Sequence, residues 1–286
     1  MKQGEVVEII TPKKVVLKGI WFGPKKAKRT IVLVHGLSAS AFSMQGLVQA
    51  FLKDGTAVLV FNNRGHEVIS SISYATGNDR LLSGGAHERF SDCADDIQGA
   101  INFAKRQGTK NVFLAGHSTG CQKSVYWASQ HGGGRGVEGI ILLAPISDWA
   151  SDMKLIGAKK VARAVRVARL LVGKGKKHAL LPEGVWHQVY DAQRFLSLHD
   201  PDSIEEIFTY SQPGKTPHTL KRARKPICVF LAEKDEYGDR PASKIAKWFE
   251  ANLRNGDVII VPRVKHSFRG AEKEIAETVR EWAEAL

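Results

Sequence analysis

The chain has few cysteines and no long apolar run, and each shortage argues against a class of protein. Only three cysteines occur among 286 residues, Cys93, Cys121 and Cys228, and their spacing is not that of a zinc site. We expect all three to be buried, reduced thiols, as free cysteines usually are. No stretch of about 18 uncharged apolar residues occurs, which argues against a membrane-spanning helix.

Targeting and metal-binding motifs are also missing. Glu5 and Glu8 lie where a signal peptide would have its apolar run. Together with the reduced thiols, this predicts a cytoplasmic location. The sequence contains neither an H-E-x-x-H pattern nor a clustered carboxylate motif, so we expect no metal site.

Positive charge is abundant and unevenly distributed. The formal net charge is +13, and residues 151–225 contain 15 Lys and Arg against 7 Asp and Glu. Such an excess can steer an anionic substrate or an acidic surface, or it can be an ordinary solvated face, which we favour. The basic run Lys221–Lys225 has no recognised nucleic-acid-binding motif around it, so we expect no specific nucleic-acid partner. Oligomeric state is not predicted.

Short apolar runs alternate with longer segments of helical period, which predicts an α/β fold with helices on both faces of a mainly parallel sheet. Glu5–Ile10 and Val15–Phe22 alternate apolar and polar residues, as in an antiparallel edge hairpin. Six wholly apolar runs are typical of buried parallel strands, giving eight in all: Ile31–Val34, Ala57–Phe61, Val112–Ala115, Ile140–Ala144, Ile227–Leu231 and Val258–Val261.

Five segments between these strands have helical character: Phe42–Lys53, Asp92–Gln107, Thr119–Gln130, Ala242–Leu253 and Ala271–Leu286. Ser91 is a candidate N-cap for the second helix. Gly55, Gly108 and Gly256 each follow a helix, where a glycine at the C-terminal cap is expected.

One region breaks the alternation and predicts an inserted helical cap. Residues 147–225 separate two sheet strands by more than one crossover helix needs, so we assign 1–146 and 226–286 to the core and 147–225 to the cap. Within the cap, Lys159–Val172 is amphipathic, with Arg163, Arg166 and Arg169 on its polar face. We expect a second cap helix to begin near Asp202.

Gly116-His117-Ser118-Thr119-Gly120 matches the pattern G-x-S-x-G between a predicted strand and a predicted helix. The chain turns sharply at such a nucleophile, so side chains at the glycine positions would crowd it, and the helix N-terminus favours developing negative charge. This predicts Ser118 as a nucleophile. Nine other histidines compete with His266, but His266 lies in the loop after the last strand, where the base of such a serine is expected.

The acid that orients the base should lie between Ser118 and His266 in the chain. Asp235 follows the strand Ile227–Leu231 closely and is our prediction, with Asp239 and Glu236 as alternatives. The backbone N–H groups of Leu37 and Thr119 are the predicted oxyanion hole, since Leu37 follows an early strand and Thr119 follows the nucleophile.

Two further residues are candidates for the substrate pocket. These are Trp149, at the start of the insertion, and His87. His117, next to the nucleophile, is interpreted as a packing residue, and Trp149 has core packing as its alternative.

Together these residues resemble the α/β-hydrolase superfamily over nearly the whole chain outside the insertion. Asn63-Arg64-Gly65-His66 resembles a superfamily segment whose role is usually structural. Gly84–Cys93 and Leu143–Asp148 resemble a branch that includes fungal esterases of cyclic hydroxamate siderophores. This resemblance implies hydrolysis of a bulky or cyclic ester, such as a siderophore or a macrolide lactone, beneath the cap.

Several activities stay open at this level. Ser118 excludes the superfamily members that use a carboxylate or a cysteine nucleophile. A serine carboxylesterase that needs no cofactor is our prediction. A thioesterase, amidase or acyltransferase would use the same triad, and a ligand-binding receptor of the same fold is an alternative of another class.

Overall fold

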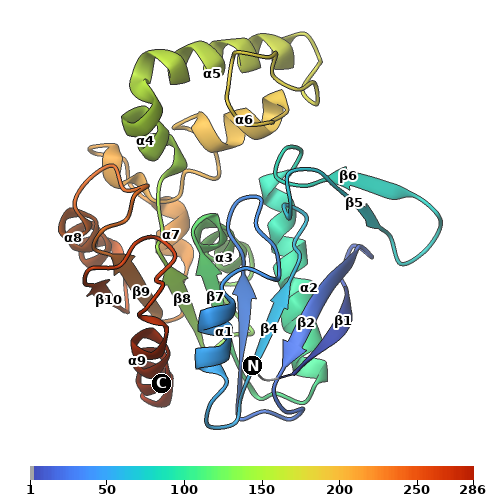
Figure 1. Cartoon of the computed structure of the whole chain (residues 1–286), viewed down its shortest axis with the longest axis vertical. Helices are drawn as coiled ribbons and strands as arrows, with labels where there is room; N and C mark the ends of the chain where they lie inside the picture. Colours follow the sequence, from blue (N-terminus) through green and yellow to red (C-terminus); the bar gives the residue numbers. More distant parts are fainter. Residues whose placement is uncertain (1–2) are drawn as a thin grey trace.

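A computed structural model describes residues 3–286, and its centre is an eight-stranded sheet in the order β1-β2-β4-β3-β7-β8-β9-β10 (Figure 1). The strands are β1 (Gly4–Ile10), β2 (Val16–Phe22), β3 (Arg29–Val34), β4 (Thr56–Phe61), β7 (Asn111–His117), β8 (Gly139–Leu143), β9 (Ile227–Ala232) and β10 (Gly256–Val261). β1 and β2 form an antiparallel hairpin, β2 is antiparallel to β4, and all the other neighbours are parallel. The predicted fold class and edge hairpin are therefore confirmed.

Helices cover both faces of this sheet. Alternate residues of each central strand point to opposite sides, and because both sets of side chains are apolar, each face is buried beneath helices. The helices are α1 (Gln45–Phe51), α2 (Cys93–Arg106), α3 (Thr119–Gln130), α8 (Ala242–Asn252) and α9 (Glu272–Glu284). On one face, Ile31 and Leu33 of β3 belong to a buried cluster with residues of α1 and α9. On the other face, Val32 and Val34 belong to a cluster with residues of α2, α3 and α8.

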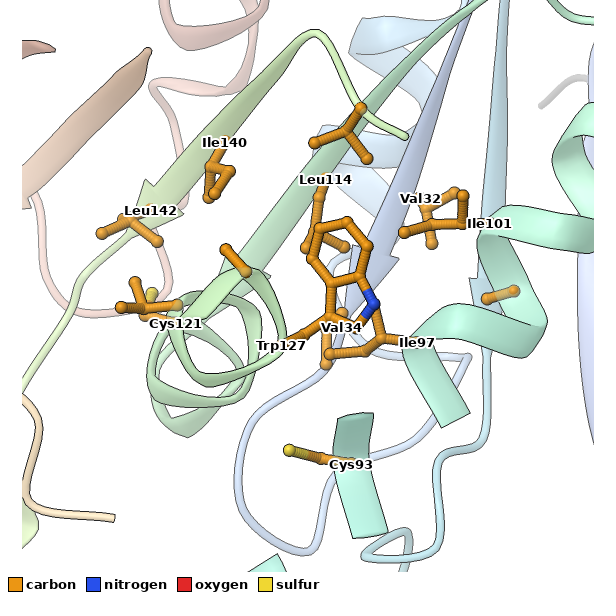
Figure 2. Close-up of a cluster of buried hydrophobic side chains, with 14 of the residues drawn as sticks. Val32, Val34, Cys93, Ile97, Ile101, Leu114, Cys121, Trp127, Ile140 and Leu142 are labelled. Carbon is orange, nitrogen blue, oxygen red and sulfur yellow. The ribbon is translucent and has the colours of Figure 1, made fainter. Parts of the chain in front are cut away.

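The cluster beneath α2 and α3 is drawn in Figure 2. Trp127 of α3 is fully buried there, and its Nε1 donates a hydrogen bond of 3.1 Å to Gln98 of α2, so its polar atom is satisfied. Cys93 and Cys121 border the same cluster, and Cys228 is buried in β9. All three cysteines are buried and free, as predicted.

A helical region lies between β8 and β9. It contains α4 (Asp148–Asp152), a π-helical turn (Met153–Gly157), α5 (Ala158–Gly173), α6 (Ala192–His199), a 3₁₀ turn (Thr209–Ser211) and α7 (His218–Arg222). Figure 1 shows α5 as its outermost element, lying over α6.

This region has a small hydrophobic core of its own, in which Val161 and Ala168 of α5 pack with Phe195 of α6. The chain then returns to the sheet, since Phe208 and Leu220 belong to the main core. The division into a core and a cap at residues 147–225 stays a prediction.

The second cap helix was placed wrongly. Residues 201–205 form turns and a bend, and the helix is α6, which ends at His199. Asp191 caps α6 by accepting a 2.7 Å hydrogen bond from the backbone N–H of Arg194. Asp200 accepts a bond from the backbone N–H of Asp202, a local turn that competes with a helix at this point.

Three predicted caps, Ser91, Gly256 and Gly55, are also wrong. Ser91 lies inside a 3₁₀ turn (Phe90–Asp92) that leads directly into α2, and Asp92 at the N-cap already has helical backbone angles. Gly256 is the first residue of β10, where a Cβ would overlap the carbonyl oxygen of Ile227. Gly108 directly follows the C-cap of α2 and has a positive φ angle of 87°, as a glycine that ends a helix does. Gly55 also has a positive φ angle, 75°, but it lies beyond the end of α1, in the turn that leads into β4. The short hairpin of β5 (Ser70–Ser73) and β6 (Arg80–Ser83) was not predicted.

Candidate active site

Ser118 occupies a strained turn between β7 and α3. Its φ and ψ are 55° and −126°, a region that residues other than glycine rarely adopt. A Cβ at Gly116 would overlap the backbone of Gly120, and a Cβ at Gly120 would overlap the carbonyl oxygen of Val34. Both glycines of the motif are therefore required by the close approach of α3 to the strands below it.

His266 and Asp235 meet at the ends of neighbouring strands. Asp235 follows β9, His266 follows β10, and their side chains are only 13% and 9% exposed. His266 Nδ1 lies 2.8 Å from Asp235 Oδ2. Because an ionised carboxylate only accepts hydrogen bonds, Nδ1 carries the proton and Nε2 is left to act as a base.

The two alternative acids make other contacts. Asp239 accepts hydrogen bonds of 2.9 and 2.7 Å from the guanidinium of Arg240. Glu236 accepts a 3.0 Å hydrogen bond from the backbone N–H of His266 and so holds the loop, not the imidazole ring. Of the three carboxylates, Asp235 is the one that contacts the ring.

His117 also holds this loop, a role that the sequence did not suggest. Its Nε2 lies 3.0 Å from the carbonyl oxygen of His266, so Nε2 must be the donor. Burial, with a smaller contribution from the nearby His266, lowers the pKa of His117 to about 4. The ring of Tyr237 lies edge-on to that of His266, with 4.9 Å between centroids. In the sequence, the one indication of this role for His117 was its position next to Ser118.

His117 brings the loop of His266 beside Ser118, which is half buried. Within residues 3–286, no hydrogen bond joins Ser118 Oγ to the ring of His266. In hydrolases this contact is often long before substrate binds.

The loop after β3 lies against Ser118. A Cβ at Gly36 would be 3.0 Å from Ser118 Cβ and 3.5 Å from its Oγ, so the backbone approaches the serine closely. Leu37 and Ser38 form a turn in which Ala39 N–H donates to Gly36 O at 3.3 Å. In the described part of the chain, the N–H groups of Leu37 and Thr119 have no protein acceptor.

His35 holds the loop after β3 in place. Its Nδ1 donates to the carbonyl oxygen of Gly36 at 2.8 Å, and its Nε2 accepts the backbone N–H of Asn63 at 3.2 Å. Burial and the positive charge of Lys123 lower its pKa to about 3, so the ring is neutral. Arg64 pairs with the carboxylates of Asp95 and Asp96 in α2, in line with the structural role expected of Asn63–His66.

The two pocket candidates, Trp149 and His87, lie in different cavities. His87 borders a cavity of about 630 Å³, where its Nδ1 is 3.1 Å from Asp191 Oδ2. Trp149 borders an open groove of about 820 Å³ along α5. Neither Ser118 nor His266 is among the described residues that line these two cavities, so their role in binding substrate stays a prediction.

A buried ionic cluster between α3 and α6 was missed from the sequence. Lys123 of α3 lies 2.5 Å from Glu88, which also contacts Arg194 of α6 at 3.1 Å, and Arg194 pairs with Glu205. All four side chains are at most 2% exposed. Burial alone would raise the pKa of Glu88, but the charges of Lys123 and Arg194 hold it below its ordinary value. The cluster ties α3 to α6.

Among the described residues, no group of three or more His, Cys, Asp or Glu side chains is arranged to hold a metal ion. The helices of residues 3–286 are also too short or too polar for any of them to cross a membrane.

A family model described as "Protein of unknown function (DUF1749)" matches residues 82–282. The chain belongs to this family. The matched range includes Ser118, Asp235 and His266, whereas Leu37 lies before it. No curated protein matches the chain.

This DUF1749 chain is similar to several solved structures over nearly its whole length. GrgF, an alpha/beta hydrolase from Penicillium sp. sh18, is 13% identical with a TM-score of 0.72, covering 99% of this chain and 98% of that one. DcsB in complex with its substrate analogue is 15% identical with a TM-score of 0.70, covering 99% of both chains. The Pyrococcus furiosus esterase Pf2001 is 16% identical with a TM-score of 0.61, covering 99% of this chain and 91% of that one. These similarities establish the α/β-hydrolase fold predicted from the sequence.

Proposed function

We propose that this chain is a serine hydrolase that cleaves a carboxylic ester through an acyl-enzyme, with Ser118 as nucleophile, His266 as base and Asp235 as the orienting acid. The observation that carries the proposal is the buried 2.8 Å contact between His266 Nδ1 and Asp235 Oδ2, in a loop that His117 ties to the strained turn of Ser118. The fold it shares with an esterase of Pyrococcus furiosus supports ester chemistry.

The reaction follows from the protonation state of His266. Nε2 takes the proton of Ser118 Oγ as the oxygen attacks the ester carbonyl, and Asp235 stabilises the imidazolium that forms. The N–H groups of Leu37 and Thr119 stabilise the oxyanion of the tetrahedral intermediate. The alcohol leaves with the proton from Nε2, and water then hydrolyses the acyl-enzyme by the same steps in reverse order.

For the substrate we propose a bulky or cyclic ester of the siderophore or macrolide type. The support is the resemblance of Gly84–Cys93 and Leu143–Asp148 to siderophore esterases and the helical region 147–225, which we propose as a cap. DcsB, a structure of similar fold, was solved with its substrate analogue. Thioesters and amides are the alternatives that use the same triad.

The test is hydrolysis of a panel of p-nitrophenyl esters, bulky lactones, a thioester and an anilide by the wild type and Ser118→Ala. We expect ester cleavage by the wild type and a loss of at least about a thousandfold in Ser118→Ala. Ser267→Ala is the matched control, because Ser267 is an exposed serine next to His266, and it should keep full activity. Cleavage of only the thioester or only the anilide would replace carboxylic esters with thioesters or amides as the substrate class. Equal activity in Ser118→Ala would refute the mechanism.

A further inference from the structure

The outer surface of the helical region carries an uninterrupted block of positive charge. Between Asp152 and Glu183 the chain has nine Lys and Arg residues and no acidic residue. All nine are exposed: Lys154, Lys159, Lys160, Arg163, Arg166, Arg169, Lys174, Lys176 and Lys177. Most of them lie on α5 or directly after it, and Figure 1 shows that α5 is the element furthest from the sheet at this end of the molecule.

Almost none of this charge is neutralised within the chain. Arg169 pairs with Asp200 at 2.8 Å, and Lys154 donates to the carbonyl oxygen of Gly238. In the described part of the chain, the other seven make no ion pair with a carboxylate. The nearby Asp152 is held instead by His199, whose Nε2 lies 2.7 Å from its carboxylate. The surface is therefore open to an external anionic partner.

Exposed apolar side chains accompany the cations. Leu155, Leu170 and Leu180 of the same segment are 48%, 60% and 45% exposed. The open groove of about 820 Å³ along α5 has apolar residues in its lining, among them Val165 and Trp149, together with the basic residues Arg166, Arg169 and Lys174. Nucleic acid would use the cations alone, whereas a lipid surface uses both kinds of residue, since a helix that lies in a bilayer interface buries apolar side chains among basic ones.

We propose that this surface, residues 154–180, docks on a bilayer rich in anionic phospholipid. The lysines and arginines contact the lipid phosphates and headgroup carboxylates, while Leu155 and Leu170 enter the boundary of the acyl chains. Docking through α5 turns the end of the molecule that carries the helical region toward the bilayer (Figure 1). The proposal concerns binding only and does not depend on the ester chemistry of Ser118.

The experiment is cosedimentation of the full-length protein with vesicles of phosphatidylcholine, with and without about one-third phosphatidylserine. We expect binding only to the anionic vesicles, and loss of binding at high salt as the charges are screened. The triple variant Lys159→Glu/Arg163→Glu/Arg166→Glu should bind at least about tenfold more weakly. Lys110→Glu/Lys244→Glu/Lys247→Glu reverses three exposed lysines away from this segment, changes the net charge equally, and should bind like the wild type.

Leu155→Gln/Leu170→Gln tests the apolar part without changing charge. It should weaken binding to the anionic vesicles several-fold and leave binding to duplex DNA, the competing polyanion, unchanged. Ser118→Ala should bind vesicles like the wild type, so failure of the hydrolase proposal would leave this result intact. Thermal unfolding checks each variant, and Gln in place of Glu in the charged triple gives the same prediction if the reversal prevents folding.

Three results would overturn the proposal. These are no binding to the anionic vesicles, equal weakening of vesicle binding by the two charge-reversed triples, or binding to DNA that is tighter than binding to the anionic vesicles and that the leucine variant does not affect. The last result would assign the surface to nucleic acid.

Discussion

At the scale of single residues, the central feature is that one of three neighbouring carboxylates contacts the imidazole of His266. Asp235 holds Nδ1, Glu236 holds the backbone N–H, and Asp239 is bound to Arg240. These contacts distinguish Asp235, which we propose as the orienting acid, from the two other carboxylates a few positions away. Asp239 can therefore serve as the control in a mutational test of Asp235.

Asp235→Asn should lower kcat by roughly a thousandfold or more, because an amide donor at this position favours the wrong tautomer of His266. Asp239→Asn should lower kcat by less than about tenfold, since the carboxylate of Asp239 faces Arg240. The measurement is ester hydrolysis by both variants, with the melting temperature as a check on folding. A larger loss in Asp239→Asn would move the acid to that residue.

The positions of Ser118, Asp235 and His266 were predictable because each follows a wholly apolar strand in the chain order of the superfamily. The contacts of His117 and Glu236 with the loop of His266 were not predictable. They depend on how that loop folds back after β10, and no local pattern encodes this. Trp149 and His87 were chosen by their places in the chain, which do not determine which cavity each one lines.

At the scale of elements, the sharp turn from β7 to α3 depends on how closely the helix approaches β3. A Cβ at Gly120 would overlap the carbonyl oxygen of Val34, and backbone cannot shift as cheaply as a side chain. A Cβ at Gly36 would meet mainly Ser118, at 3.0 Å from its Cβ. The two glycines are therefore required for different reasons, one for stability and one for the site.

Gly120→Ala should destabilise the fold by about 3 kcal/mol or more, as overpacking against fixed backbone does. Gly36→Ala should cost less stability but lower activity strongly, because it displaces Ser118. Gly173→Ala is the control, since Gly173 is helical and a Cβ there would have no neighbour within 4 Å among the described residues. Chemical denaturation and ester hydrolysis measure both effects, and equal stability of Gly120→Ala and Gly173→Ala would contradict this account.

Strands were predicted better than the elements of the insertion. A strand buried on both faces is wholly apolar, so its pattern is local and strong. The helix expected near Asp202 failed because Ile204, Ile207 and Phe208 are apolar for another reason: Ile207 and Phe208 enter the main core from irregular chain, and Ile204 is exposed. The hairpin of β5 and β6 is short and mostly polar, so no apolar alternation marked it.

At the scale of the whole molecule, buried polar contacts hold the helical region together and join it to α3. Glu206 accepts a 2.6 Å hydrogen bond from Ser147 Oγ, and the backbone N–H of Ser147 donates to the hydroxyl of Tyr210 at 2.8 Å. Burial raises the pKa of Glu206 from 4.5 to about 7. The ionic cluster of Lys123, Glu88 and Arg194 joins the region to α3. Its members are far apart in sequence, so only the fold brings them together.

Glu206 should make stability depend on pH. Its folded pKa is raised, so its favourable contribution is present below its unfolded value of 4.5 and is lost as pH rises through about 7. Glu206→Gln keeps an acceptor for Ser147 but stays neutral. Relative to the wild type, the variant should gain about 2 to 3 kcal/mol of stability between pH 5 and pH 8.

Denaturation of Glu206→Gln at the two pH values measures this difference. Glu183→Gln is the control, because Glu183 is exposed, and it should change little at either pH. A gain of the same size at pH 5 and pH 8 would show that Glu206 is already ionised in the folded protein at pH 5, which would contradict a raised pKa.

The most direct test of the central claim is covalent labelling with a fluorophosphonate, followed by intact-mass measurement. Ser118 Oγ should attack phosphorus and expel fluoride, which adds one phosphonyl group per wild-type chain whatever the natural substrate. Ser118→Ala should stay unlabelled, and Ser267→Ala should label like the wild type. Equal labelling of Ser118→Ala, or no labelling of a folded wild type, would contradict the assignment of Ser118 as an activated nucleophile.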